Sequence, residues 1–304
     1  MKKLRIVIAL VVLLCAAIGG FVFYGLWNIK IEQVTDDLYV LSGLGGNTAV
    51  LRTNAGSVIV DTMSMPIQGF RIKQLAEKIT GQPLALLINT HYHPDHTHGN
   101  PGFHEDARII SSRNTLNNLQ TFDGDFWEKH FEHLPNEKAA NEQLIELGNK
   151  KIKLIQMKPS HTDGDLAVHF VDEKALHTGD LVFNGLFPIV DLDAGGSFEG
   201  WSEALKDFTP IDFEIVIPGH GSVTDRTGLN RFRVFVDGVA SFVRESRVQE
   251  LNREETLALA DTSRAQSLFK GLKEIKVFGF SIDINKQSVL DAVWHEARRI
   301  PYQD

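Results

Sequence analysis

The chain of 304 residues contains a single cysteine, Cys15. The fold therefore needs no disulfide bridge, and no thiolate is available to a metal or active site after residue 15. The sequence also lacks internal repeats, low-complexity tracts, a Gly-rich phosphate loop and any patch that mixes basic and aromatic residues. The last two absences weigh against nucleic acid as a partner.

Positive charge is scarce outside the first thirty residues. The formal charge is −8, from 39 acidic and 31 basic residues. Residues 1–30 carry Lys2, Lys3, Arg5 and Lys30 but no acid, so the rest of the chain carries −12. An acidic body repels phosphates, which disfavours a nuclease and favours a small-molecule substrate. With 43% hydrophobic and 23% charged residues, the composition is that of a globular enzyme.

One long hydrophobic run lies at the N-terminus. Three basic residues precede an uncharged segment from Ile6 to Trp27, which is long enough to cross a bilayer core of ~30 Å. The positive-inside rule then places the remaining chain on the extracytoplasmic side, the periplasm in a bacterium. We predict a single-pass inner-membrane anchor. The alternative is a cleaved signal peptide, cut near residues 17–19, which would give a secreted protein.

The strongest chemical signal is the segment 91–96, His-Tyr-His-Pro-Asp-His, with four metal-ligand side chains in six residues. It follows the apolar run 84–88, which is typical of a buried strand. Loops at the carboxyl ends of such strands commonly carry the chemistry of α/β proteins. Residues two apart in an extended segment point the same way, so His91 and His93 can bind one ion. Pro94 turns the chain and directs Asp95 and His96 elsewhere.

Further ligands are expected from other turns, because one ion needs three or four of them. Four candidates follow short apolar runs that end in a turn or an acidic residue: Asp61, His161, Asp180 and His220. Separate strands would thus bring these side chains to one edge of the fold.

In this order the five motifs resemble those of the metallo-β-lactamase superfamily, over about residues 34–223. The resemblance implies an α/β fold of the αββα type, in which two mixed sheets pack face to face with helices outside. It assigns His91, His93 and His161 to a first metal, and Asp95, His96 and His220 to a second. Asp180 would bridge the two ions, and Asp95 and Asp180 would be the catalytic carboxylates. Asp61 would be a buried acid that orients the 91–96 loop.

Two features distinguish branches of this family. Many metallo-β-lactamases use a cysteine as a ligand to the second metal, which Cys15 cannot supply from its N-terminal position. Those with only histidine and aspartate ligands generally lack a bridging carboxylate, whereas Asp180 would provide one. The ligand set is therefore more similar to those of hydroxyacylglutathione hydrolases, lactonases and arylsulfatases. Flavo-diiron proteins have glutamate where this chain has His93, which disfavours a redox role.

Ligands of nitrogen and oxygen with a bridging carboxylate suit two zinc ions, with iron or manganese as alternatives. Such a pair lowers the pKa of a shared water from ~15.7 to about 7 and polarises a substrate oxygen. We predict a dinuclear zinc hydrolase that uses a bridging hydroxide on an ester, thioester or lactone-like substrate. The alternatives are a periplasmic β-lactamase-type amide hydrolase and a non-catalytic metal-binding accessory protein.

The predicted pocket edge follows Asp180. Phe183 and Phe187 are expected to border the pocket and to favour an apolar acyl or aryl group. No lysine occurs from residue 181 to 193 to bind a β-lactam carboxylate. Of the remaining histidines, we expect His98 to be solvent-exposed, and His169 and His177 to lie in the core. The sequence leaves the oligomeric state open.

Three regions are predicted along the chain: an anchor or signal segment (1–30), a catalytic core (31–225) and a helical part packed on the core (226–304). Within the core we expect strands at 36–41, 47–53, 107–111, 151–157, 166–171 and 174–177, helices at 66–80 and 197–208, and mostly helix over 112–147. After Asp225 we expect helix to about residue 255 and again from 287 to 299.

Overall fold

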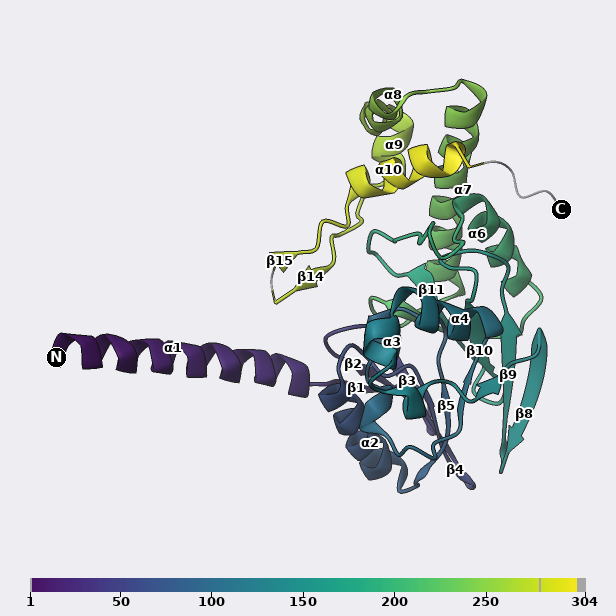
Figure 1. Cartoon of the computed structure of the whole chain (residues 1–304). Coiled ribbons are helices and arrows are strands. Elements are labelled where there is room, and N and C mark those ends of the chain that lie inside the picture. Colours follow the sequence, from purple (N-terminus) through teal and green to yellow (C-terminus); the bar gives the residue numbers. More distant parts are fainter. Residues whose placement is uncertain (1, 279, 300–304) are drawn as a thin grey trace.

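The computed structural model describes residues 2–278 and 280–299, without the side chains of residues 2–10, 12, 13 and 16. Two large mixed sheets flanked by helices form the body of the protein, and α1 (Lys2–Trp27) extends away from it (Figure 1). The predicted α/β fold with two packed mixed sheets is therefore present.

The first sheet has seven strands in sequence order. Its strands are β1 (Lys30–Gln33), β2 (Leu38–Ser42), β3 (Thr48–Thr53), β4 (Gly56–Val60), β5 (Leu84–Ile88), β6 (Ile109–Ser111) and β7 (Glu137–Lys138). The first four pair antiparallel and the last four pair parallel. The carboxyl ends of β4 and β5 consequently lie at the same edge of the sheet.

The second sheet has six strands in the order β13-β12-β11-β10-β9-β8. They are β8 (Glu142–Leu147), β9 (Lys150–Gln156), β10 (Leu166–Phe170), β11 (Ala175–Phe183), β12 (Ile215–His220) and β13 (Thr224–Asp225). All neighbours are antiparallel except β11 and β12. That parallel pair brings the ends of β11 and β12 together.

Successive side chains of a strand point to opposite faces of its sheet, so each sheet packs against a layer on both sides. In β4, Val58 and Val60 join the cluster between the two sheets, whereas Ile59 faces α2 (Pro66–Thr80) on the outside. This is the two-residue period of a strand with both faces covered. On the other side, α6 (Phe198–Ala204) and α7 (Arg226–Val248) bury Trp201 and Phe232 against the second sheet.

The remaining helices are short, apart from the last. They are α3 (Pro94–Thr97), α4 (Arg113–Phe122), α5 (Gly124–Trp127), α8 (Arg253–Ala258), α9 (Ser263–Leu268) and α10 (Lys286–Ala297). Single 3-10 turns cover Asn100–Gly102, Phe131–His133, Leu205–Phe208 and Leu259–Asp261. In Figure 1, α8, α9 and α10 gather at the far end of α7, away from the sheets.

Two local predictions were wrong, and one element was not predicted. Helix covers only the first part of 112–147, because β8 forms a hairpin with β9 around Gly148 and Asn149, where Gly148 has a φ of 58°. A Gly-Asn pair between two strands is a hairpin signal that outweighs the helix-forming residues of β8. Strand β11 continues to Phe183, so Asp180 lies inside a strand. Between α9 and α10 the chain forms a small hairpin, β14 (Lys276–Val277) and β15 (Phe280–Ser281), that we did not predict.

The predicted membrane-spanning segment coincides with α1, but the side chains of residues 6–10, 12, 13 and 16 lie outside the described part of the chain. Among the residues that the structure does describe, no helix combines the length and the apolar character needed to cross a membrane.

Candidate metal centre

All seven predicted ligands lie at one edge of the two sheets. The loop after β5 and the short helix α3 carry His91, His93, Asp95 and His96, and the loop between β9 and β10 carries His161. Asp180 lies within β11, and His220 is the last residue of β12. The parallel pairing of β4 with β5 and of β11 with β12 explains this convergence.

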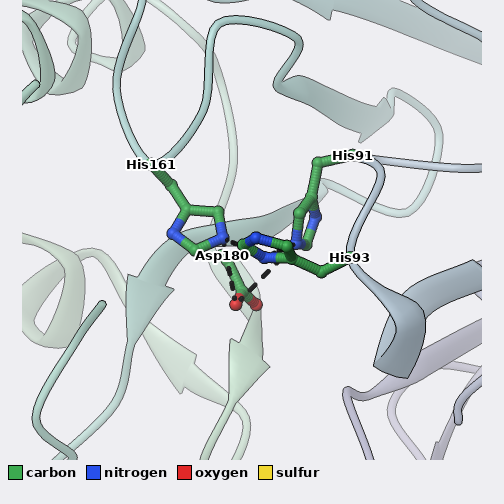
Figure 2. Close-up of side chains that lie close together, drawn as sticks. All are labelled: His91, His93, His161 and Asp180. Atoms are coloured by element: carbon green, nitrogen blue, oxygen red, sulfur yellow. Dashed lines mark hydrogen bonds and ion pairs between the residues drawn. The ribbon is translucent and has the colours of Figure 1, made fainter. Parts of the chain in front are cut away.

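The ligands form two groups. We call His91, His93, His161 and Asp180 the three-histidine cluster, and Asp95, His96 and His220 the Asp95 cluster; within each, the facing ligand atoms lie within 4.8 Å of one another. Figure 2 shows the three imidazoles of the first cluster turned toward one another, with the Asp180 carboxylate beside them.

Asp180 reaches both clusters. Its Oδ2 lies 3.5 Å from His161 Nε2 and 3.9 Å from His91 Nε2. Its carboxylate also lies 3.1 Å from His96 Nε2, through Oδ1, and 3.4 Å from His220 Nε2, through Oδ2. One carboxylate therefore faces nitrogen ligands from both groups.

In His91 and His161, the ring nitrogen that points away from the cluster donates a hydrogen bond. The other ring nitrogen, which faces the cluster, therefore carries a lone pair. Thr90 gives its only hydroxyl proton to Asp61 Oδ2, over 2.7 Å, so His91 Nδ1 must donate to Thr90 Oγ1, 3.0 Å away. His161 Nδ1 donates to the carbonyl of Ile189 at 2.8 Å. The Nε2 atoms of both rings are thus unprotonated, face the cluster and can coordinate an ion.

The third ring of this cluster is held in the opposite sense. His93 Nε2 donates to Asp191 Oδ2 at 3.0 Å, which leaves Nδ1 with the lone pair. That Nδ1 lies 3.1 Å from His91 Nε2 and 2.8 Å from His161 Nε2. Three lone pairs at these distances repel one another unless a cation lies between them, which is the arrangement of a metal site.

The Asp95 cluster also contains buried ligand atoms that call for a cation. His96 Nδ1 donates to Asp61 Oδ2 at 2.8 Å, and its Nε2 faces the cluster. Burial disfavours the charged form of His96, but the carboxylates of Asp180, Asp95 and Asp61 outweigh it and raise the pKa of His96 well above its usual range, so an ion must displace the proton on Nε2. Both His96 Nε2 and Asp180 Oδ1 are buried and make no hydrogen bond. Unpaired buried polar atoms are costly unless something else binds them. The nitrogen and oxygen ligands therefore fit divalent ions of the zinc type.

Asp61 supports both clusters from behind. It is fully buried, and its carboxylate accepts from Thr90 N at 2.8 Å as well as from His96 and the Thr90 hydroxyl. Its φ of 63° is unusual for a residue with a side chain, and such strain commonly occurs at functional sites. The buried acid behind the 91–96 loop is thus present.

Asp191 is the supporting residue that sequence reasoning missed. Besides His93, its carboxylate accepts from the Tyr92 hydroxyl, and its backbone N–H donates to the His161 carbonyl at 2.8 Å. Partial burial alone would raise the pKa of Asp191, but the hydrogen bonds to its carboxylate from His93, Tyr92 and the Ala194 N–H outweigh it and lower that pKa. No local motif marks this residue, because it lies about a hundred positions from the histidine that it orients.

Burial and neighbouring charge act differently on the two clusters. Burial, assisted by His96, holds the pKa of His91 well below its usual range, and burial lowers that of His161 to about 4. Burial also disfavours the charged form of His220, but the Asp180 carboxylate outweighs it and raises that pKa to about 10. Metal binding to the Asp95 cluster must therefore displace a proton from His220.

Outside these clusters the predictions had mixed outcomes. His169 and His177 are buried and hydrogen-bonded, as expected for core histidines. His98 is not freely exposed, because it pairs with Asp123 at 2.6 Å and stacks on Phe126. Phe183 stacks on His220, with ring centroids 5.2 Å apart, whereas Phe187 packs against Phe269.

A cavity of about 640 Å³ opens onto the clusters, with His93, Asp95, Asp180 and His220 in its wall. Its volume lies within the range of small-molecule sites. Phe183 borders this cavity as predicted, but Phe187 is not among its lining residues. Lys276, from β14, also lines it and places a cation there that the sequence analysis did not anticipate.

Comparisons with known proteins agree with this geometry. The sequence profile of the metallo-beta-lactamase superfamily matches residues 41–220. One curated relative is the 2,4-dinitroanisole O-demethylase subunit alpha of Nocardioides sp., with 24% identity over 63% of this chain and 55% of that protein. Another is the hydroxyacylglutathione hydrolase of Cereibacter sphaeroides, with 26% identity over 56% of this chain and 58% of that protein. The chain thus spans somewhat over half the length of these relatives. Its fold is similar to that of a sec-alkyl sulfatase, PisA1 (TM-score 0.69, 13% identity, covering 88% of this chain and 50% of that one).

Proposed function

Because the chain belongs to the metallo-beta-lactamase superfamily, we propose that it is a metal-dependent hydrolase that binds two divalent ions, preferably zinc. The three-histidine cluster would hold one ion and the Asp95 cluster the other. The observation that carries this proposal is the position of Asp180, whose carboxylate lies within 3.9 Å of a nitrogen from each cluster.

The ions would supply an acidified water and an electrophile for the substrate oxygen. Asp180 sets the spacing between the clusters, and Asp61 and Asp191 orient the imidazoles. Asp95 is the more exposed of the two catalytic carboxylates, with 34% of its side chain accessible, so it is placed to relay protons at the cavity.

We propose an ester, thioester or lactone as the substrate. Water oxygen bonds to the carbonyl carbon, and the bond from that carbon to the leaving oxygen or sulfur breaks. One water proton ends on the leaving group, and the other is released as the acid product ionises. A second candidate is β-lactam hydrolysis, because Lys276 lines the cavity and could pair with a substrate carboxylate.

A substrate panel on one zinc-loaded preparation tests these alternatives. We expect kcat/KM for an aryl ester or acyl thioester to exceed that for a chromogenic cephalosporin by at least about tenfold, a difference of ~1.4 kcal/mol in transition-state binding. The reverse order would favour the β-lactamase alternative. No turnover of any substrate, with both ions bound, would favour an accessory protein.

Location on the extracytoplasmic side, anchored or secreted, also remains a proposal. It rests on the three basic residues before the apolar run of residues 6–27. Protease treatment of intact spheroplasts tests it, because an exported chain is cleaved while a cytoplasmic control protein is not.

A further inference from the structure

Much of the wall of the cavity over the clusters comes from three segments that supply no metal ligand. The end of α1 contributes Val22 and Leu26, the loop after β11 contributes Leu186 and Ile189, and the β14–β15 hairpin with its flanks contributes Phe278 and Ile282. Most of the other lining residues outside the two clusters are also aliphatic or aromatic. The polar exceptions with side chains are Ser64, Glu274 and Lys276.

The hairpin is attached at both ends. At its base, Phe187 N donates to the Lys273 carbonyl and Lys273 N donates to the Gly185 carbonyl, each over 3.0 Å. These bonds join it to the loop that leaves β11, the strand of Asp180. At its tip, Phe278 packs on α1, where a Cβ added to Gly25 would lie 2.5 Å from the Phe278 ring. Glycine at this position lets the ring approach the helix backbone.

From this arrangement we infer that α1 and the β14–β15 hairpin form a wall that selects substrates with an extended apolar chain next to the hydrolysed bond. This inference rests on the proposed hydrolase function and specifies its substrate class. Each methylene transferred from water to such a wall strengthens binding by roughly threefold to fourfold. Small or fully polar substrates would leave the wall in contact with water and gain none of this affinity.

Glu274 and Lys276 offer an alternative way to recognise a substrate, through charge rather than apolar contact. Both are exposed, and their alternate positions along an extended segment direct them to the same side. If they were the main recognition elements, a charged group would dominate specificity and chain length would matter little. Apolar side chains outnumber these two among the lining residues, so we assign recognition to the wall.

Chain-length series on the zinc-loaded full chain test the assignment. We expect kcat/KM to rise at least about 100-fold from acetyl to octanoyl, in p-nitrophenyl esters or in the matching acyl thioesters. Ile282→Ser and Leu26→Ser should each lower the octanoyl value about tenfold and leave the acetyl value within about twofold. Phe280→Ser is the matched control, because Phe280 is 77% exposed on the same hairpin and does not line the cavity. A flat series, or a larger loss from Lys276→Ala than from Ile282→Ser, would overturn the inference.

A binding measurement separates this inference from the proposed chemistry. Decanol should displace a fluorescent apolar probe from the metal-free protein, and Ile282→Ser should weaken decanol binding about tenfold while Phe280→Ser does not. Decanol binding without hydrolysis of any ester would support the wall and reject the hydrolase. Hydrolysis that is indifferent to chain length, without decanol binding, would reject the wall alone.

Discussion

The two ligand clusters are built from the same residue types but are supported differently. In the three-histidine cluster each ring has its own outer acceptor: Thr90 for His91, Asp191 for His93 and the Ile189 carbonyl for His161. In the Asp95 cluster only His96 has one, from Asp61; among the described residues, no acceptor is bonded to the outer nitrogen of His220, whose Nε2 pairs with Asp95 at 3.1 Å instead.

Exposure follows the same division only in part. His91 and His161 are at most 1% accessible and His93 exposes 19% of its side chain, whereas His96 is fully buried and His220 and Asp95 expose 13% and 34% of theirs. The rings of His91 and His161 are also neutral without metal, because burial lowers their pKa. The three-histidine cluster is thus preorganised for an ion, and the Asp95 cluster is the more open and more easily emptied site.

Asp180 belongs to both clusters, so its loss should have the largest effect. Asp180→Ala should lower kcat by about 100-fold or more, because one carboxylate sets the spacing needed for water activation and oxyanion stabilisation together. The variant should still unfold cooperatively, since the sheets pack through residues away from this edge. Near-normal turnover would mean that the bridge plays no part in the reaction.

His220→Ala tests whether the clusters fill independently. Protein purified without chelator should carry close to two divalent ions, and the variant close to one, because the remaining three-histidine cluster keeps all its ligands. Metal analysis by mass spectrometry gives the count. His161→Ala is the matched comparison and should weaken the tighter site instead. A single ion in the wild type, unchanged in His220→Ala, would contradict the dinuclear proposal.

Substitution of the carboxylates that orient the imidazoles should have smaller effects, each mainly on the metal affinity of one cluster. Asp191→Asn removes the acceptor of His93 and should weaken the three-histidine cluster by roughly 10–100-fold, the usual cost of losing such a partner. Asp61→Asn should weaken the Asp95 cluster directly, through His96, and the three-histidine cluster less, because Asp61 reaches His91 only through the Thr90 hydroxyl. Competition with a graded set of chelators measures both affinities. Equal weakening of both sites by Asp191→Asn would mean that the two clusters are not independently supported.

The sequence predicted the metal edge better than its surroundings. Strand β4 and the residues after it were predictable, because Val58, Ile59 and Val60 are all apolar and a buried acid follows. The ligands converge because strand ends meet at one edge, a rule that needs no long-range information. Asp191 and the β14–β15 hairpin were not predictable, since the contacts that define them join segments far apart in the chain.

The smaller errors have local causes. Strand β8 has helix-forming residues such as Glu142 and Glu146, and only its pairing with β9 makes it a strand. Phe187 lies close in sequence to the predicted pocket edge but packs against Phe269, in the core cluster that also contains Phe235 of α7. Sequence patterns fix which face of a strand is buried, whereas partners across the chain decide how a loop is used.

The last expected effect is on stability rather than on metal binding or turnover, and concerns Asp165, which anchors the loop of His161. Its buried carboxyl accepts from Thr162 N at 2.9 Å and Thr162 Oγ1 at 2.6 Å, yet burial raises its pKa to about 7. Below pH 3.8 the group is neutral in both the folded and the unfolded chain. Between pH 4 and 7 the unfolded chain releases this proton while the folded chain keeps it, so stability falls as pH rises, by up to about 1.4 kcal/mol per unit.

Asp165→Asn removes that proton, so it should remove this part of the pH dependence. Relative to wild type, the metal-free variant should be less stable near pH 4, because the asparagine amide nitrogen cannot accept and one of the two hydrogen bonds is lost, and should recover or exceed wild-type stability near pH 7. Urea unfolding at several pH values, with chelator in every sample, measures the difference. A stability gap between the two proteins that stays constant from pH 4 to 7 would show that this carboxyl is ionised in the fold. The His161 loop would then be anchored by a charged carboxylate.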